Sequence, residues 1–370
     1  MIRVGDVARI IERAAPLALA LPDDNPGLQV GRADAVVRGV LVALDPTPAA
    51  LRRAARAKAD LLITHHPLFM DPLRRIDTGT ATGAAVAAAM SAGISVYAAH
   101  TNLDAAPEGL AVAVARRLGI EDLCFLHPAN GPGWVKVVVF SPVAAVAKLH
   151  AAMVAAGAGA IGRYDSCAFL APGEGLFRPL AGARPAIGTQ GKLERVPEVR
   201  LEMIAGEAEL PAVLAAIRRA HPYELPAIDC LPLHPAPLGG FGCIGRVRSE
   251  RLGAFVRRAA QALGAEARVS GARVPRVETV AVCPGSGGRL VALAAAAGAD
   301  VFVTGEVRYH NMREAEHHGI AIVELGHDRT EMPAVDLLAR LIRGGLAAVG
   351  ASVPVAIYKE PRAARTAAGR

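Results

Sequence analysis

A short apolar strand that ends in two adjacent histidines and a proline constrains this chain more than any other stretch. Residues 61–64 (Leu-Leu-Ile-Thr) have the character of a buried strand, and His65-His66-Pro67 follows directly. Neighbouring strand residues point to opposite faces, so the two imidazoles can share a site only where the chain leaves strand geometry. Pro67 removes a backbone donor and holds His66 extended, which favours a strand end here. One histidine in the core and one in solvent is the alternative, but the pair together with the partners described below favours a metal site.

Apolar strands alternate with helices on both sides of this stretch. The alternation predicts an α/β fold with parallel sheets and helices on their faces. The expected helices cover residues 4–18, 47–59, 82–92, 108–118, 252–263, 290–297 and 310–318, and the expected strands 36–44, 61–64, 94–99, 267–270, 277–282, 301–304 and 320–324.

The middle of the chain has a different texture and predicts an inserted domain. Segments rich in Pro and Gly flank it at residues 127–133 and 234–240. The order βαββαβ is that of a ferredoxin-like domain. We therefore expect two lobes of one α/β core at residues 1–126 and 239–370, with the insertion at 127–238. Its expected strands are 134–140, 160–170, 196–204 and 228–233, and its expected helices are 143–156 and 210–220.

Composition excludes several classes of protein. Among the 370 residues no apolar run reaches the roughly 18 needed to cross a bilayer, and the N-terminus lacks a secretory pattern. Five scattered cysteines form neither a CxxC pair nor a disulfide framework. The net charge of +7 comes from dispersed arginines without a basic face or an aromatic platform, so it does not indicate nucleic-acid binding. We expect a cytoplasmic protein with no membrane partner.

Two further strand ends carry ligand-type side chains. The strand at 94–99 runs into His100-Thr101-Asn102-Leu103-Asp104, and the strand at 320–324 is followed by His327 and Glu331. His327 and Glu331 are four residues apart, so they share one face of a helix that starts there. The candidate ligands are three imidazoles and two carboxylates, which suit two divalent ions sharing a carboxylate better than one closed zinc site. They are His65, His66, Asp104, His327 and Glu331.

Three other features are weaker. The glycine-rich segment 283–288 lies between a strand and a helix, where its amides can meet an anion, although a tight turn explains it equally well. Glu306 follows a strand and can orient a ligand histidine. His310 is a candidate for a second-shell or acid–base role, whereas His317 and His318 are expected at a solvated helix end.

These motifs together resemble the Nif-three-like dinuclear-metal-centre proteins, also called GTP cyclohydrolase 1 type 2 homologs. The resemblance spans the chain in the family's order. It departs at Asp328–Thr330, where the family commonly has an aromatic residue after Gly-His, which leaves the preferred substrate open. The matching segments are Asn25–Gly31, Thr64–Leu68, His100–Asp104, Thr304–Glu306 with His310, and Gly326-His327 with Glu331.

The resemblance implies a Nif-three-like core of two α/β lobes, and it implies that the insertion, with its His221–Pro226 motif, is a PII/CutA-like domain. It implies two divalent metal ions per chain, with Zn, Mn, Fe and Mg not distinguished, and a ring-shaped homohexamer. By analogy Glu331 bridges the ions, with His66 and Asp104 on one and His65 and His327 on the other.

The activity implied is hydrolysis by metal-activated water, with GTP ring opening as the reaction. Nothing in the sequence reads guanine, so this substrate comes from the resemblance alone. Two alternatives remain. One is a metal-dependent phosphoesterase, because paired metals suit in-line displacement. The other is a metal-binding hexameric scaffold or regulatory protein without turnover. In a hydrolase we expect His310 to carry a proton to the leaving group.

Overall fold

The computed structural model describes residues 1–129, 133–161, 164–233 and 239–360. The chain divides into two compact units, which are treated separately below. One unit combines residues 1–131 with 237–370, and the other comprises residues 132–236. No helix in the described ranges is both long and apolar enough to cross a membrane.

The first sheet of the larger unit contains the strand that precedes the paired histidines. β3 lies at its centre between β2 and β4, all three parallel, and all of their residues are buried. β1 pairs antiparallel with β4 at one edge, and β15 pairs parallel with β2 at the other. The strands are β1 (Gly27–Val30), β2 (Val40–Ala43), β3 (Leu61–Thr64), β4 (Ser95–Ala98) and β15 (Val355–Ile357).

The second sheet of the larger unit has six strands in the order β11-β14-β13-β12-β10-β5. Its central strands β12, β13 and β14 are parallel, and the other three pair antiparallel with their neighbours. The strands are β5 (Glu121–Ala129), β10 (Gly239–Arg251), β11 (Arg268–Gly271), β12 (Arg276–Ser286), β13 (Val301–Glu306) and β14 (Ala321–Glu324).

Helices cover both sheets of this unit. Threonine caps begin two of them, because Thr47 accepts from the N–H of Ala50 and Thr80 from that of Gly83, each at 3.1 Å. The elements are α1 (Val4–Ala14), η1 (Leu17–Leu19), α2 (Pro48–Arg56), α3 (Ala81–Ser91), α4 (Thr101–Asp104), α5 (Leu110–Arg117), α8 (Leu252–Leu263), η3 (Gly288–Leu290), α9 (Val291–Ala296), α10 (Tyr309–His318), α11 (His327–Glu331) and α12 (Pro333–Ala348).

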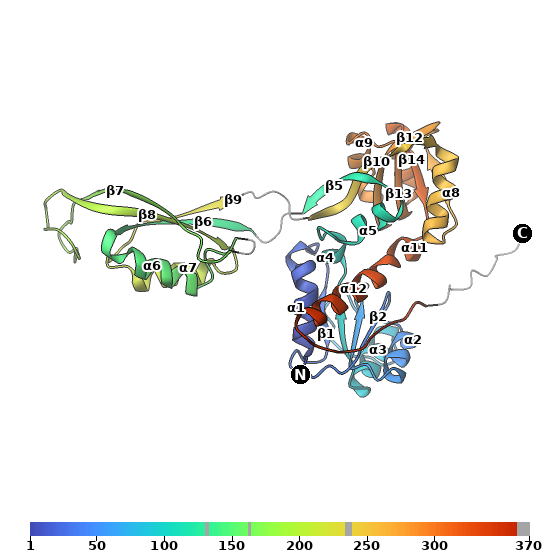
Figure 1. Cartoon of the computed structure of the whole chain (residues 1–370), viewed down its shortest axis with the longest axis horizontal. Helices are drawn as coiled ribbons and strands as arrows, with labels where there is room; N and C mark the ends of the chain where they lie inside the picture. Colours follow the sequence, from blue (N-terminus) through green and yellow to red (C-terminus); the bar gives the residue numbers. More distant parts are fainter. Residues whose placement is uncertain (130–132, 162–163, 234–238, 361–370) are drawn as a thin grey trace, which may run out of the picture. The chain divides into compact units, whose positions relative to one another are not determined.

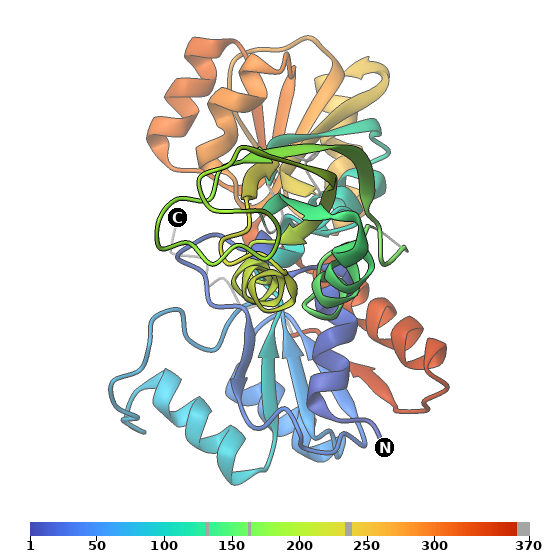
Figure 2. The ribbon, with the colours of Figure 1, turned by 90° about the vertical axis from the view of Figure 1, so that its left-hand side faces the viewer.

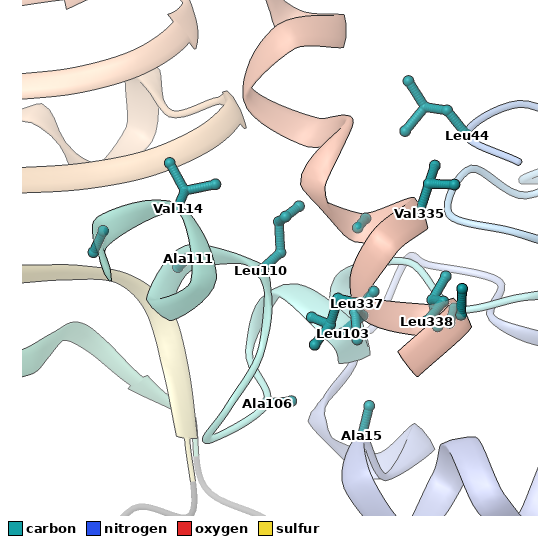
Figure 3. Close-up of a cluster of buried hydrophobic side chains, with 14 of the residues drawn as sticks. Ala15, Leu44, Leu103, Ala106, Leu110, Ala111, Val114, Val335, Leu337 and Leu338 are labelled. Carbon is teal, nitrogen blue, oxygen red and sulfur yellow. The ribbon is translucent and has the colours of Figure 1, made fainter. Parts of the chain in front are cut away.

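One apolar core joins the two sheets of the larger unit. Leu110 and Val114 of α5 lie in the same buried cluster as Val335 and Leu338 of α12, together with Leu103 (Figure 3). The cluster continues into strands of both sheets. Because the two sheets share this core, the segments that follow their strands are held in fixed positions relative to each other.

The smaller unit is one antiparallel sheet in the order β7-β8-β6-β9. Its chain order is βαββαβ, as expected for a ferredoxin-like domain. α6 and α7 lie side by side on one face of the sheet (Figures 1 and 2). The relationship to PII/CutA-like domains stays a prediction. The elements are β6 (Trp134–Pro142), η2 (Val143–Ala145), α6 (Val146–Ala155), β7 (Phe169–Phe177), β8 (Glu194–Gly206), α7 (Leu210–Ala220) and β9 (Ile228–Leu233).

The α/β core is confirmed, and several elements differ from expectation. The strand expected at residues 160–170 lies instead at β7, and residues 23–31, expected as a loop, contain β1. β5, β10, α12 and β15 were not predicted. The expected joints at 127–133 and 234–240 include the ends of β5 and β10, which pair with each other. The larger unit therefore extends a few residues into the segment expected as the insertion.

Candidate metal centre

The two adjacent histidines follow β3. The backbone N–H groups of His65 and His66 both donate to the carbonyl of Leu44, at 3.1 and 3.0 Å, so the chain curls after Thr64. The Thr64 hydroxyl donates to the carbonyl of His66 at 2.7 Å and holds this turn. The two rings lie only 5.2 Å apart between centroids. This is the departure from strand geometry that a shared site requires.

The segment after β4 brings two more side chains to the same edge of the sheet. His100 is the N-cap residue of α4, and Asp104 is its last residue. The ring of His100 lies 5.3 Å from that of His65 and 5.7 Å from that of His66. Asp104 is not a cap of α5, whose N-cap residue is Gly109. It faces His65 instead, with 3.6 Å between Oδ1 and the imidazole Nε2.

α11 contributes the remaining two candidates. Gly326 precedes it with φ of 87°, a backbone conformation that favours glycine. His327 and Glu331 are the first and last residues of α11 and share one face, with 3.0 Å between His327 Nε2 and Glu331 Oε2. The Glu331 side chain is only 7% exposed. A carboxylate buried to this degree requires positive charge close by.

Glu331 is the point at which the groups from the two sheets meet. Its Oε2 lies 2.8 Å from His66 Nε2 and 3.0 Å from His327 Nε2, whereas its Oε1 lies 4.0 Å from His65 Nε2. His65 also faces Asp104. The distances group His66 with His327 and His65 with Asp104. The family resemblance implied the other division, with His66 and Asp104 together.

Each imidazole of the cluster has its Nδ1 bound to an oxygen, which directs Nε2 toward the centre. Such outer contacts fix the ring orientation and the tautomer of histidines that bind metals. The acceptors are the Ala99 carbonyl for His65 (2.9 Å), Asp45 for His66 (2.7 Å), Asp24 for His100 (2.7 Å) and Glu306 for His327 (3.1 Å).

Two buried atoms of the cluster lack a hydrogen-bond partner among the described residues. They are His65 Nε2 and Asp104 Oδ1, which face each other at 3.6 Å. Because His65 Nδ1 donates to a carbonyl, its Nε2 presents a lone pair when the ring is neutral. Two acceptors that face each other without a donor fit a cation between them. The donor set of imidazoles and carboxylates suits a divalent transition metal, and the cluster can hold a metal ion.

The pKa values of these groups reflect their mutual contacts. Burial lowers the pKa of His65 to about 4. Burial also lowers that of His66, but hydrogen bonds to Asp45 and Glu331 outweigh it and raise the pKa to about 10. The hydrogen bond to Glu331 raises the pKa of His327 to about 9. Without metal, His66 and His327 therefore hold protons at neutral pH, and Glu331 lies between them.

The two carboxyl groups shift in opposite directions. Burial, aided by the charge of Glu331, raises the pKa of Asp104 to about 7. Burial alone raises the pKa of Glu331, but hydrogen bonds from His327 and His66 hold it well below its usual range. Glu331 is therefore the permanent negative charge of the cluster.

The glycine-rich segment forms a wall of this cluster. Gly285 has φ of 63°, and a β-carbon there would lie 2.1 Å from Glu331 Oε1 and 3.5 Å from His327 Nε2. Its N–H donates to the Thr330 hydroxyl at 3.0 Å, which attaches the segment to α11. The segment starts within β12 and continues into η3. Its glycine makes room for the Glu331 carboxylate.

The remaining histidines of interest lie elsewhere. His310 is exposed on the first turn of α10, and its side chain makes no hydrogen bond or ion pair with the described residues. His317 and His318 are exposed at the end of the same helix. No role was predicted for His100, Asp24 or Asp45 from the sequence. His100 lies within the His100–Asp104 motif, but its contacts are to residues that are distant in the sequence, so they could not be predicted.

Comparisons with known proteins extend over nearly the whole chain. The family model described as Duf34/NIF3 (NGG1p interacting factor 3) matches residues 2–362. A protein of Halalkalibacterium halodurans named GTP cyclohydrolase 1 type 2 homolog is 38% identical over 325 residues, which cover 87% of each chain. A protein of the same name from Mycobacterium tuberculosis is 38% identical over 363 residues, or 96% of this chain and 94% of the relative.

Two solved structures have a similar fold. The Bacillus cereus protein related to NIF3 is 34% identical, with a TM-score of 0.77 and 98% of each chain covered. Staphylococcus aureus protein SA1388 has a TM-score of 0.81 over 98% of each chain at 23% identity, a likeness of fold alone.

Proposed function

The chain belongs to the Duf34/NIF3 family, and from that premise we propose that it is a dinuclear metal-dependent hydrolase that acts on GTP. The observation that carries the proposal is the pair of buried acceptor atoms, His65 Nε2 and Asp104 Oδ1, that face each other without a donor. The family membership agrees with the resemblance inferred from the motifs. The names of the curated relatives support GTP as the substrate.

The proposed centre takes two divalent ions that share Glu331. The distances favour His65 and Asp104 with Oε1 for one ion, and His66 and His327 with Oε2 for the other. His100 lies within ligand distance of His65 and His66, since the ligand atoms of these three residues are within 4.8 Å of one another. It is therefore a candidate for a further ligand. Zn, Mn and Fe suit this imidazole-rich donor set better than Mg, which prefers oxygen ligands.

The residues of the chain have separate tasks in this proposal. Divalent ions bound here supply Lewis acidity and make water nucleophilic near neutral pH. Asp45 and Glu306 hold the rings of His66 and His327 so that their Nε2 atoms point to Glu331. Glu331 keeps its negative charge because its pKa is held low.

We assign proton transfer to the leaving group to His310. The residue is exposed, and it follows β13, whose last residue Glu306 binds His327. His310→Ala is expected to lower turnover by roughly 10²–10⁴, the usual range for general acid–base groups, without loss of metal. Unchanged turnover with full metal content would leave His310 as a surface residue.

The experiment that tests the function is an assay of metal-loaded protein against three outcomes. Protein stripped of metal and reloaded separately with Zn, Mn, Fe or Mg is incubated with GTP, and formate and GTP are measured. Formate release supports ring opening. Hydrolysis of p-nitrophenyl phosphate without formate would support a phosphoesterase, and turnover of neither would support a scaffold or regulatory protein.

A variant ties any activity to the cluster. Glu331→Ala removes the shared carboxylate, so metal content should fall from about two ions per chain to one or none, and turnover should fall with it. His317→Ala, an exposed histidine on α10, is the matched control and should retain both. Full metal occupancy in Glu331→Ala, measured by elemental analysis, would refute the bridging role.

We also propose that the protein acts as a ring-shaped homohexamer in the cytoplasm. Support for self-association comes from family membership and from the near-complete match to the Bacillus cereus structure. Light scattering coupled to size-exclusion chromatography tests it, with six copies expected. A monomeric mass across a range of protein concentrations would overturn this assembly.

A further inference from the structure

A cavity of about 350 Å³ lies within the smaller unit, apart from the residues of the metal centre. It is formed by the end of β7, the segment that follows it, and the segment between α7 and β9. Its size is at the lower end of the range for small-molecule sites. Residues that line it include Phe140, Phe177, Arg184, Ile187, Glu198 and Tyr223.

A buried carboxylate lines this cavity. Glu198 of β8 is only 9% exposed, and its Oε1 accepts a hydrogen bond from the Tyr223 hydroxyl at 2.8 Å. Its Oε2 has no hydrogen-bond partner among the described residues. A β-carbon at Gly175 would lie 2.3 Å from this Oε2, so the glycine makes room for the carboxylate. An acceptor that lines a cavity and has no donor from the protein can accept hydrogen bonds from a bound molecule.

The tyrosine beside this carboxylate is held on several sides. Its backbone N–H donates to His221 Nδ1 at 3.0 Å, and His221 Nε2 donates to the carbonyl of Phe140 at 2.9 Å. The Tyr223 ring lies 5.8 Å from that of Phe177 and 5.0 Å from that of His221. The aromatic side chains that line the cavity are therefore held in place before any ligand binds, and their rings offer flat apolar surface.

Two arginines line the same cavity and have free guanidinium groups. Arg178 and Arg184 are exposed, and neither guanidinium forms an ion pair or hydrogen bond with the described residues. Only the backbone N–H of Arg184 is bound, to Glu224 at 3.0 Å. Planar guanidinium groups suit bidentate contacts with phosphate. The cavity thus combines an acceptor, aromatic surface and anion-binding groups.

We propose that this cavity binds a guanine nucleotide, with the base at Glu198 and the phosphate at Arg178 and Arg184. A carboxylate only accepts hydrogen bonds, and guanine presents two neighbouring donors, the N1–H and the exocyclic amine, on one edge. Adenine lacks this donor pair, so the site selects guanine. The site shares no residue with the metal centre, and the proposal does not depend on hydrolysis there.

The test is calorimetric titration of the full-length, metal-loaded protein with GMP, guanosine, AMP and inorganic phosphate. GMP should bind at least tenfold more tightly than AMP, because a buried acceptor left without a donor is unfavourable. Guanosine should bind more weakly than GMP. Inorganic phosphate alone should bind most weakly.

Variants assign the binding to this cavity. Glu198→Gln retains the volume but replaces an acceptor with a donor, so GMP affinity should fall about tenfold or more. Arg184→Ala should weaken GMP and leave guanosine unchanged. Glu202→Gln is the matched control on the same strand, because Glu202 is paired with Lys136 and does not line the cavity. Circular dichroism verifies that each variant is folded.

Two results would overturn the proposal: equal affinity for GMP and AMP, or GMP affinity unchanged in Glu198→Gln. The metal-depleted Glu331→Ala protein should bind GMP as tightly as the parent chain. If GTP turnover fails while GMP binding and its dependence on Glu198 remain, only the proposed hydrolase is wrong. GMP binding that is lost in Glu331→Ala and kept in Glu198→Gln would place the nucleotide at the metal centre and refute the second site.

Discussion

At the scale of single residues, the centre depends on how closely glycine and carboxylate approach each other. Gly285 leaves the space in which Glu331 Oε1 lies, and its N–H is bound to Thr330 of the same helix. The ligand-type side chains come from distant segments, yet the Nδ1 atom of each ligand-type histidine is held by a hydrogen bond. Small changes of volume here should therefore act like the loss of a ligand.

Gly285→Ala should reduce metal content without removing any ligand-type group. The added methyl would overlap Glu331 Oε1, and the positive φ of the residue adds backbone strain. We expect metal affinity to fall by about 10- to 100-fold, as for disrupted outer contacts of metal sites. Competition with a chelator measures it. Gly264→Ala, also at positive φ but at the C-cap of α8, is the control for strain alone, and equal loss in both variants would contradict the steric explanation.

Metal binding at neutral pH should release protons. His66 and His327 have raised pKa values, about 10 and about 9, so the metal-free protein holds a proton on each at pH 7. A metal must displace both, and Asp104, with a pKa of about 7, adds a fraction of a proton, so we expect about two to three protons released per chain and an affinity that rises from pH 6 to pH 9. Titration calorimetry in buffers with different ionisation enthalpies counts these protons. A binding heat that does not depend on the buffer would contradict this prediction.

The ligand-type residues that could be predicted from the sequence are those in the segments that directly follow strands. His65, His66, Asp104, His327 and Glu331 all lie at such positions, and the structure brings them together. The sequence could not predict which of these residues group together around Glu331, because this grouping depends on the relative position of the two sheets. His100, Asp24 and Asp45 were missed for the same reason, since their contacts are non-local.

At the scale of elements, glycine and proline explain most of the differences between expectation and structure. Gly239 and Gly240 suggested a joint, yet both belong to β10, where a β-carbon would lie 1.8 Å from the Ala105 carbonyl oxygen and 2.6 Å from Phe125 Cβ respectively. The strand expected to end at residue 170 continues through Pro172, because β7 is an edge strand, where proline is tolerated. In the first case close packing, and in the second an edge position, outweighed the low preference of glycine and proline for strands. β3, β9 and α8 agree with the expected ranges.

β1 should matter for metal binding although it contributes no ligand. Gln29 donates to the carbonyl of Phe69 at 3.3 Å and to that of Asn25 at 2.8 Å, so it holds the segment that follows the paired histidines. Gln29→Ala should lower metal affinity about tenfold. Gln261→Ala, an exposed glutamine on α8, is the matched control in a chelator competition assay. Equal affinity in both variants would show that this segment keeps its place without β1.

At the scale of the whole molecule, and among the described residues, the metal cluster consists of residues of the larger unit and the cavity is lined by residues of the smaller one. The Pro/Gly-rich flanks predict a division of the chain near residues 127 and 238, and the two compact units comprise residues 1–131 with 237–370 and residues 132–236. The sequence could not locate it to the residue, because the flanking strands β5 and β10 were themselves missed.

The larger unit should fold and bind metal without the insertion. Ala129 of β5 lies opposite Gly239 of β10, so residues 130–238 can be replaced by a short Asn-Gly turn that closes a hairpin. We expect a folded protein with the metal content of the full chain, measured by circular dichroism and elemental analysis. Loss of both folding and metal would mean that the insertion completes the core.

The same paired strands bear on the order of folding. β5 and β10 are far apart along the chain, and bringing them together requires closure of a long loop before their contacts form. In the insertion the first residue of β6, Trp134, pairs with the last residue of β9, Leu233. An insertion that folds first therefore shortens the effective loop roughly tenfold, which lowers the entropic barrier to closure by about 2 kcal/mol. Early folding of the insertion would thus speed the folding of the larger unit.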